Sequence, residues 1–70
     1  MTGPRGELTD RQQRIAALIA DGFADKEIAT LEQISEGTVS YHVARIVKLW
    51  HLDPSRNVRV QITKRWTKAA

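Results

Sequence analysis

A run of apolar residues at helical spacing is the feature that most limits how this chain can fold. The apolar positions recur at intervals of three and four residues and so share one helical face: Val39, Val43, Ile46, Val47 and Trp50. Ser35 precedes the run as a potential N-cap, and Pro54 follows it as a break. Residues 36–50 are therefore predicted to form a helix that buries one face and leaves the other free.

A second helical segment lies near the start of the chain. Thr9 and Gln12 have the spacing of a capping box, in which a hydroxyl and an amide satisfy backbone N–H groups at the helix start. The apolar and small residues behind them fall on one stripe: Ile15, Ala16, Leu18, Ile19 and Ala20. Gly22 supplies the left-handed residue that ends such a helix, which is predicted over residues 10–21.

Between these two segments, residues 25–32 predict a short helix with Ile28 and Leu31 facing inward. Ala29 permits close approach of a neighbouring helix, and Ile34 plugs the turn that follows. A short helix, a tight turn and a longer helix make a helix-turn-helix, whose second helix enters the DNA major groove. The outer face of that helix is small, polar or basic: Gly37, Ser40, Tyr41, Ala44, Arg45 and Lys48. A plain helical bundle with a polar outer face is the alternative.

The formal net charge of +3 hides an uneven distribution. Residues 1–35 carry four basic and six acidic side chains, a net charge of −2, whereas residues 36–70 carry seven and two, a net charge of +5. A basic half that carries the free helix face suggests a polyanionic partner, most often nucleic acid. A solvated basic surface would explain the same distribution.

Several classes of protein are not expected. Seventy residues allow one small domain, and the chain has no cysteine and two widely spaced histidines. It has no catalytic triad, no glycine-rich phosphate loop and no metal-ligand spacing, so neither an enzyme nor a cofactor is predicted. No apolar run approaches the roughly 20 residues that a membrane span needs. The first residues lack the apolar core of a signal peptide, and a cytoplasmic protein is expected.

Residues 56–67 fit two kinds of structure. Val58, Val60 and Ile62 alternate as in a strand, whereas Val58, Ile62 and Trp66 share one helical stripe. A lone strand would need a partner edge, for example from a second copy of the chain. The pattern alone does not choose between strand and helix.

Residues 8–52 resemble the DNA-binding domain of the LuxR/GerE family of bacterial transcription regulators. The matching residues occur in one order along the chain: Leu8, Thr9, Arg11, Leu18, Ala20, Gly22, Lys26, Glu27, Ile28, Ala29, Ile34, Ser35, Glu36, Thr38, Val39, His42 and Ile46. The resemblance implies an all-α, four-helix helix-turn-helix domain over residues 8–67, preceded by a flexible arm over residues 1–7. It also implies that the fourth helix serves dimerisation, which favours a helix over a strand for residues 56–67.

The resemblance also assigns DNA contacts position by position. Ser40 takes the place of the base-contacting lysine of the family, and Tyr41, Ala44 and Arg45 occupy the neighbouring groove-facing positions. Four further predicted DNA contacts fall where the family contacts or flanks the phosphate backbone: Lys26, Thr38, His42 and Lys48. Arg56, also predicted to contact DNA, resembles the arginine that precedes the last helix of the family, with one residue inserted before it. The predicted contacts between two copies of the chain lie on the last helix: Val58, Ile62 and Trp66.

Some positions depart from the family pattern. Two acidic positions of its first helix are Gln12 and Arg14 in this chain. The usual leucine near the end of its second helix is Glu32, and Leu31 is a candidate substitute after a slight helix rotation. Gln33 holds a turn position where glycine is common, at a cost of roughly 1 kcal/mol if the backbone there is left-handed.

The sequence thus predicts a transcription regulator that binds double-stranded DNA as a homodimer, in the bacterial cytoplasm and at the nucleoid. A non-catalytic module that binds RNA polymerase or a partner regulator is the alternative, favoured if Val58, Ile62 and Trp66 are exposed in a single copy. Family members commonly carry a receiver or ligand-sensing domain ahead of this module. This chain has about eight residues there and resembles the stand-alone members, so control by expression level or by a regulatory protein partner is expected.

Overall fold

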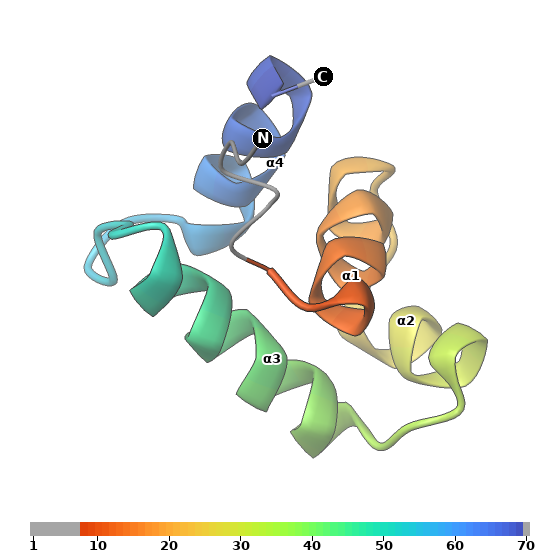
Figure 1. Ribbon diagram of the computed structural model, residues 1–70. Helices are drawn as coiled ribbons and strands as arrows, with labels where there is room; N and C mark the ends of the chain where they lie inside the picture. Colours follow the sequence, from red (N-terminus) through yellow and green to blue (C-terminus); the bar gives the residue numbers. More distant parts are fainter. Residues whose placement is uncertain (1–7, 70) are drawn as a thin grey trace.

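The computed structural model describes residues 8–69, and the arm predicted over residues 1–7 lies outside them. Four helices follow one another along the described part of the chain: α1 (Asp10–Ala20), α2 (Asp25–Glu32), α3 (Glu36–Leu49) and α4 (Val58–Ala69). The all-α prediction is confirmed, and the strand considered for residues 56–67 is wrong because α4 is helical from Val58 onward. In Figure 1, α3 lies along one side of the molecule, and α1 lies between α2 and α4.

The first helix begins and ends where local chemistry predicts. Thr9 Oγ1 accepts a hydrogen bond from Gln12 N at 3.2 Å, and Gln12 Oε1 accepts one from Thr9 N at 3.1 Å, so the predicted capping box is present. The helix ends at Ala20, one residue before the predicted end, with Asp21 as C-cap. Gly22 follows with a φ of +95°, a conformation that L side chains rarely adopt.

The starts of α2 and α4 use other caps. Ala24 offers no side-chain acceptor at the α2 N-cap, but its backbone N–H donates to Glu27 Oε1 at 2.7 Å. Asn57 caps α4, with Val60 N donating to Asn57 Oδ1 at 3.0 Å. Gln61 then ties α4 to the preceding turn, because its side-chain amide accepts from Asp53 N at 2.9 Å and donates to Asp53 O at 2.8 Å.

The core is built from the inner faces of all four helices together with Leu8. Its buried apolar residues are Leu8, Ile15, Ala16, Ile19, Ile28, Ala29, Val39, Ile46, Trp50 and Ile62. The predicted inward positions are therefore largely confirmed, and each buried side chain of this size contributes about 1.5–3 kcal/mol relative to exposure. Leu31 is the exception: it was expected to face inward but is 55% exposed.

The stripe of α4 that contains Ile62 closes this core. Ile62 is completely buried, and Val58 and Trp66 are half-buried and pack against the same core. Arg65 adds a second link, since its Nη1 donates to the Trp50 carbonyl at 3.2 Å and its Cζ lies 5.4 Å from the Trp50 ring centroid. The apolar stripe of α4 thus serves the fold of the single chain.

Candidate nucleic-acid interface

The turn between α2 and α3 sets the direction of α3. Gln33, the C-cap of α2, has φ 58° and ψ 45°, so the left-handed conformation considered for this position is present. Ile34 N donates to Ala29 O at 2.9 Å, and the half-buried Ile34 side chain packs against the core. These contacts hold α2 and α3 at a defined angle, as a helix-turn-helix requires.

The first turn of α3 is closed by hydroxyl groups. Ser35 Oγ accepts a hydrogen bond from Thr38 N at 3.0 Å, and the two hydroxyl oxygens lie 2.9 Å apart in a further hydrogen bond. The Thr38 hydroxyl, predicted to contact or flank phosphate, thus already has a partner within the chain. Gly37, in the same turn, is exposed, and a Cβ built there meets only Ser35 Oγ, at 3.7 Å.

The outer face of α3 carries most of the predicted DNA contacts. Five of them are exposed on this one helix: Ser40, Tyr41, Ala44, Arg45 and Lys48. Tyr41 is the largest apolar group among them and is 59% exposed. The face therefore combines short side chains, one exposed aromatic ring and two cations.

The basic residues fall into two groups according to their partners. Arg11, Arg14 and Arg59 form ion pairs with carboxylates, and Arg65 is held against Trp50. By contrast, within the described part of the chain no acidic partner is found for Lys64, for Lys68 or for the four predicted DNA-contacting cations: Lys26, Arg45, Lys48 and Arg56. Exposed cations without a carboxylate partner keep their charge available for a polyanion.

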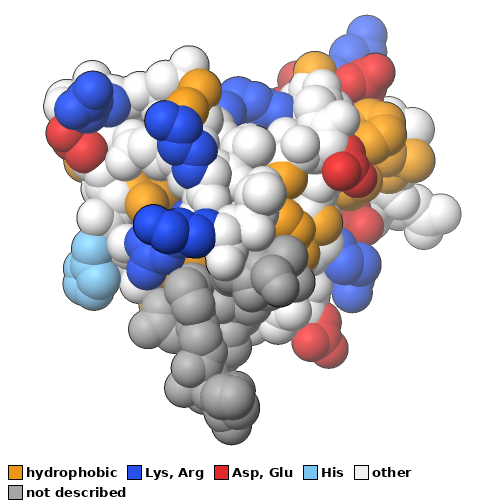
Figure 2. All heavy atoms as spheres, turned by 90° about the horizontal axis from the view of Figure 1, so that it is seen from above, with side chains coloured by type: hydrophobic (Ala, Val, Ile, Leu, Met, Phe, Trp, Pro, Cys, Tyr) orange, Lys and Arg blue, Asp and Glu red, His pale blue; other side chains and the backbone are white. Residues whose placement is uncertain are grey.

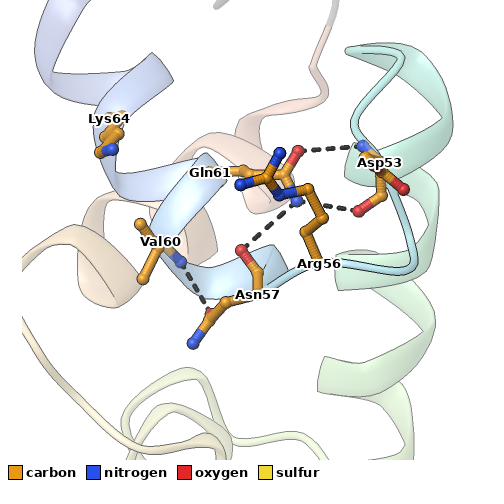
Figure 3. A pocket seen from close by; sticks show the side chains of 6 residues that line it. All are labelled: Asp53, Arg56, Asn57, Val60, Gln61 and Lys64. Atoms are coloured by element: carbon orange, nitrogen blue, oxygen red, sulfur yellow. Dashed lines mark hydrogen bonds between the residues drawn. The ribbon is translucent and has the colours of Figure 1, made fainter.

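These four cations come from three different parts of the chain. Arg45 and Lys48 lie on α3, whereas Lys26 lies on the outer face of α2, beside Phe23 and Leu31. Arg56 lines a hollow of about 420 Å³ at the start of α4, where Figure 3 shows it near Gln61 and Asp53. Figure 2 shows Lys and Arg side chains spread over the face seen from above, with Asp, Glu and hydrophobic side chains between them.

His42 differs from the other predicted contacts. Its ring is half-buried, it meets the Tyr41 ring edge-on at a centroid distance of 5.5 Å, and its Nδ1 is buried without a hydrogen-bond partner among the described residues. Burial, and secondarily the positive charge of Arg11, lower the pKa of His42 below its usual value. The lowered pKa therefore favours the neutral imidazole at pH 7.

A shallow groove of about 330 Å³ runs along one side of α3. Its lining is mostly apolar and comes from three parts of the chain: Asp25, Ser40, Val43, Ala44, Val47, Pro54 and Val58. Asp25 is the one acidic residue there, and Arg59 Nη1 donates to its Oδ1 at 2.6 Å. Sequence reasoning missed this pair, because no local pattern connects residues 34 positions apart.

Other kinds of site are not found in the described part of the chain. No group of three or more His, Cys, Asp or Glu side chains there could hold a metal ion. Among the described helices, none has the length and apolar character to cross a membrane.

A short helix, a left-handed turn and a longer helix with an exposed basic face define a helix-turn-helix domain. Residues 6–49 match the luxR family of bacterial regulatory proteins, also called GerE. The match covers more than half of the chain, and the chain belongs to this family of DNA-binding transcription regulators. The resemblance found in the residues is thus confirmed.

Two curated relatives are response regulators. The chain is 48% identical over 42 residues to the response regulatory protein YgeK of Escherichia coli (strain K12), which covers 60% of this chain and 29% of that protein. It is 36% identical over 47 residues to the two-component response regulator PprB of Pseudomonas aeruginosa, which covers 67% of this chain and 17% of that protein. The chain spans less than a third of either relative. No solved structure matches it.

Proposed function

We propose that this chain is a transcription regulator that binds double-stranded DNA sequence-specifically, with α3 in the major groove, in the bacterial cytoplasm and at the nucleoid. The observation that carries the proposal is the outer face of α3. There Arg45 and Lys48 are exposed, without acidic partners among residues 8–69, beside the short side chains of Ser40 and Ala44. A helix with such a face fits a groove about 12 Å wide, in which short side chains allow deep insertion.

The roles within this face follow from side-chain chemistry. Arg45 carries a guanidinium that can donate two hydrogen bonds to guanine, and Lys48 carries a point charge suited to phosphate. The Tyr41 ring and the Ala44 methyl group suit contact with a thymine methyl. In its neutral form, His42 contributes at most an uncharged hydrogen bond to the backbone.

A duplex-binding titration at several salt concentrations tests this function, with genomic fragments as the first probe. Affinity should fall steeply with salt, because several counterions are released. Arg45→Ala should weaken binding to a selected site by about 1–3 kcal/mol, whereas Lys48→Ala should reduce the salt slope by about one. Lys68→Ala on the far end of α4 is the matched control, and its affinity should stay near wild type. Binding that ignores salt, or equal losses for Arg45→Ala and Lys68→Ala, would contradict the proposal.

We further propose that two copies bind paired half-sites through α4. Because Ile62 is fully buried within one chain, the surface of α4 left for a second copy centres on Val60, which is 45% exposed and flanked by two hollows of about 420 Å³ each. One short helix buries little area compared with about 800 Å² per partner in a standard interface, so the dimer should be weak without DNA. Val60→Glu should then abolish cooperative binding to two half-sites and spare binding to one.

The alternative of a protein-binding module has less support. A protein-binding module would need an exposed apolar stripe formed by Val58, Ile62 and Trp66. Ile62 is fully buried, however, and the other two residues pack against the core. We also propose that a protein partner regulates this chain. A pull-down with Arg45→Ala, whose DNA binding should be weakened, would distinguish a protein that binds the chain directly from one that is bound through DNA.

A further inference from the structure

Asp25 places a negative charge beside the proposed DNA-binding surface. It lies in the first turn of α2 and lines the same groove as Ser40 and Ala44 on α3. Its side chain is 40% exposed, so the carboxylate is not hidden from a ligand that approaches α3. An unpaired carboxylate there would repel the phosphates of a duplex seated on α3.

Arg59, in the first turn of α4, forms an ion pair with this carboxylate. Its Nη1 donates to Asp25 Oδ1 at 2.6 Å, and its Nη2 donates to the carbonyl oxygen of Phe23. The two donors of one guanidinium thus hold the segment before α2 against the first turn of α4. The side chain of Arg59 is itself 40% exposed, and it is committed to these acceptors.

We propose that Arg59 is a positioning residue for DNA binding: it cancels the charge of Asp25 at the edge of the groove beside α3. This inference rests on the proposed function. Arg59 acts through Asp25, because its guanidinium donates to the Asp25 carboxylate and to the Phe23 carbonyl. The fourth helix, by this means, influences the DNA affinity of the helix-turn-helix within the same chain.

The test is a double-mutant cycle on duplex affinity with the full chain. Arg59→Gln should weaken binding about threefold to tenfold, because it leaves the Asp25 charge uncompensated. Asp25→Asn alone should bind as well as wild type or slightly better. The double variant Arg59→Gln/Asp25→Asn should bind within about twofold of Asp25→Asn, and Arg59→Lys, which keeps the charge, within about twofold of wild type.

A measurement of stability separates this role from a structural one. Neither Arg59→Gln nor the double variant can form the ion pair, so Asp25→Asn should restore affinity without restoring the thermal midpoint of Arg59→Gln. If affinity follows the thermal midpoint, if Arg59→Gln and the double variant bind equally weakly, or if Arg59→Lys binds as weakly as Arg59→Gln, the inference is wrong. Failure of the wild-type chain to bind any duplex would instead refute the proposed function.

Discussion

Arg14 donates a hydrogen bond from Nε to Glu32 Oε1 at 3.0 Å and so joins α1 to the C-terminal end of α2. Arg11 adds a longer contact to the same oxygen, at 3.7 Å, and the Glu32 side chain is only 12% exposed. The family resemblance implies an acid at position 14 and a leucine at position 32. The two departures therefore explain each other: a basic residue at 14 partners the carboxylate that replaces an apolar side chain at 32.

The first prediction concerns this exchange. Arg14→Glu should lower the free energy of unfolding by about 1–2 kcal/mol, because it places a second carboxylate beside the nearly buried Glu32. Adding Glu32→Leu, which restores the residues typical of the family at both positions, should recover that loss. Urea unfolding of the two single variants and the double variant measures the coupling. Strictly additive effects would show that the two positions do not compensate each other.

The second prediction concerns the turn of the helix-turn-helix. Gln33→Gly should raise the free energy of unfolding by up to about 1 kcal/mol, because a left-handed backbone strains any residue with a Cβ. Gln33→Ala, which keeps the Cβ, should give no such gain and serves as the control. Denaturant unfolding distinguishes them, and equal stabilities for the two variants would argue against strain at this residue.

The third prediction concerns Gly37. Its side-chain position is open, and glycine inside a helix is less favourable than alanine, so Gly37→Ala should stabilise the fold by about 0.5–1 kcal/mol. If α3 lies deep in the major groove, the same methyl group should weaken duplex binding. Thermal unfolding and a binding titration on one protein sample measure both quantities. Unchanged or tighter binding would mean that DNA does not approach this turn closely.

The fourth prediction concerns pH. Burial and Arg11 lower the pKa of His42 in the folded chain below the value of 6.5 expected when it is unfolded. The unfolded chain therefore takes up a proton first as pH falls, so the His42 contribution to stability is complete above about pH 6.5 and is lost as pH falls through the lower folded pKa. His42→Gln should flatten the stability profile in this range, measured by urea unfolding from pH 7.5 to pH 5. Parallel profiles for the two proteins would contradict the assignment.

The helices and the helix-turn-helix could be predicted because their signals are local. Thr9, Gln12, Gly22 and Ser35 act within one turn of their own positions, and each is found in its predicted role or conformation. The inner face of α3 was equally clear, since a helix with one apolar stripe buries that stripe. The left-handed turn at Gln33 could also be anticipated from the family pattern.

Leu31 and His51 mark the limit of such signals. Leu31 fits the apolar pattern of α2, yet the helix turns Ile28 and Ala29 inward and leaves Leu31 at the surface. His51 adopts a φ of 55° after α3, which nothing in its local sequence indicated. The exposure of Leu31 depends on how the helices dock, because docking decides which part of each stripe is covered. The φ of His51 belongs to the C-terminal end of α3, where His51 N donates to Lys48 O at 3.3 Å and Leu52 N donates to Val47 O at 2.9 Å.

The sequence by itself determined the first three helices, the tight turn and the basic outer face of α3. It also determined the family to which the chain belongs. Those features depend on spacings of a few residues and on residue types in a fixed order. Only the tertiary structure decided that residues 58–69 are helical and close the core through Ile62, that Arg14 partners Glu32, and that Arg59 neutralises Asp25 beside α3. These contacts join residues far apart in the chain, and no local periodicity records which side chains a folded core brings together.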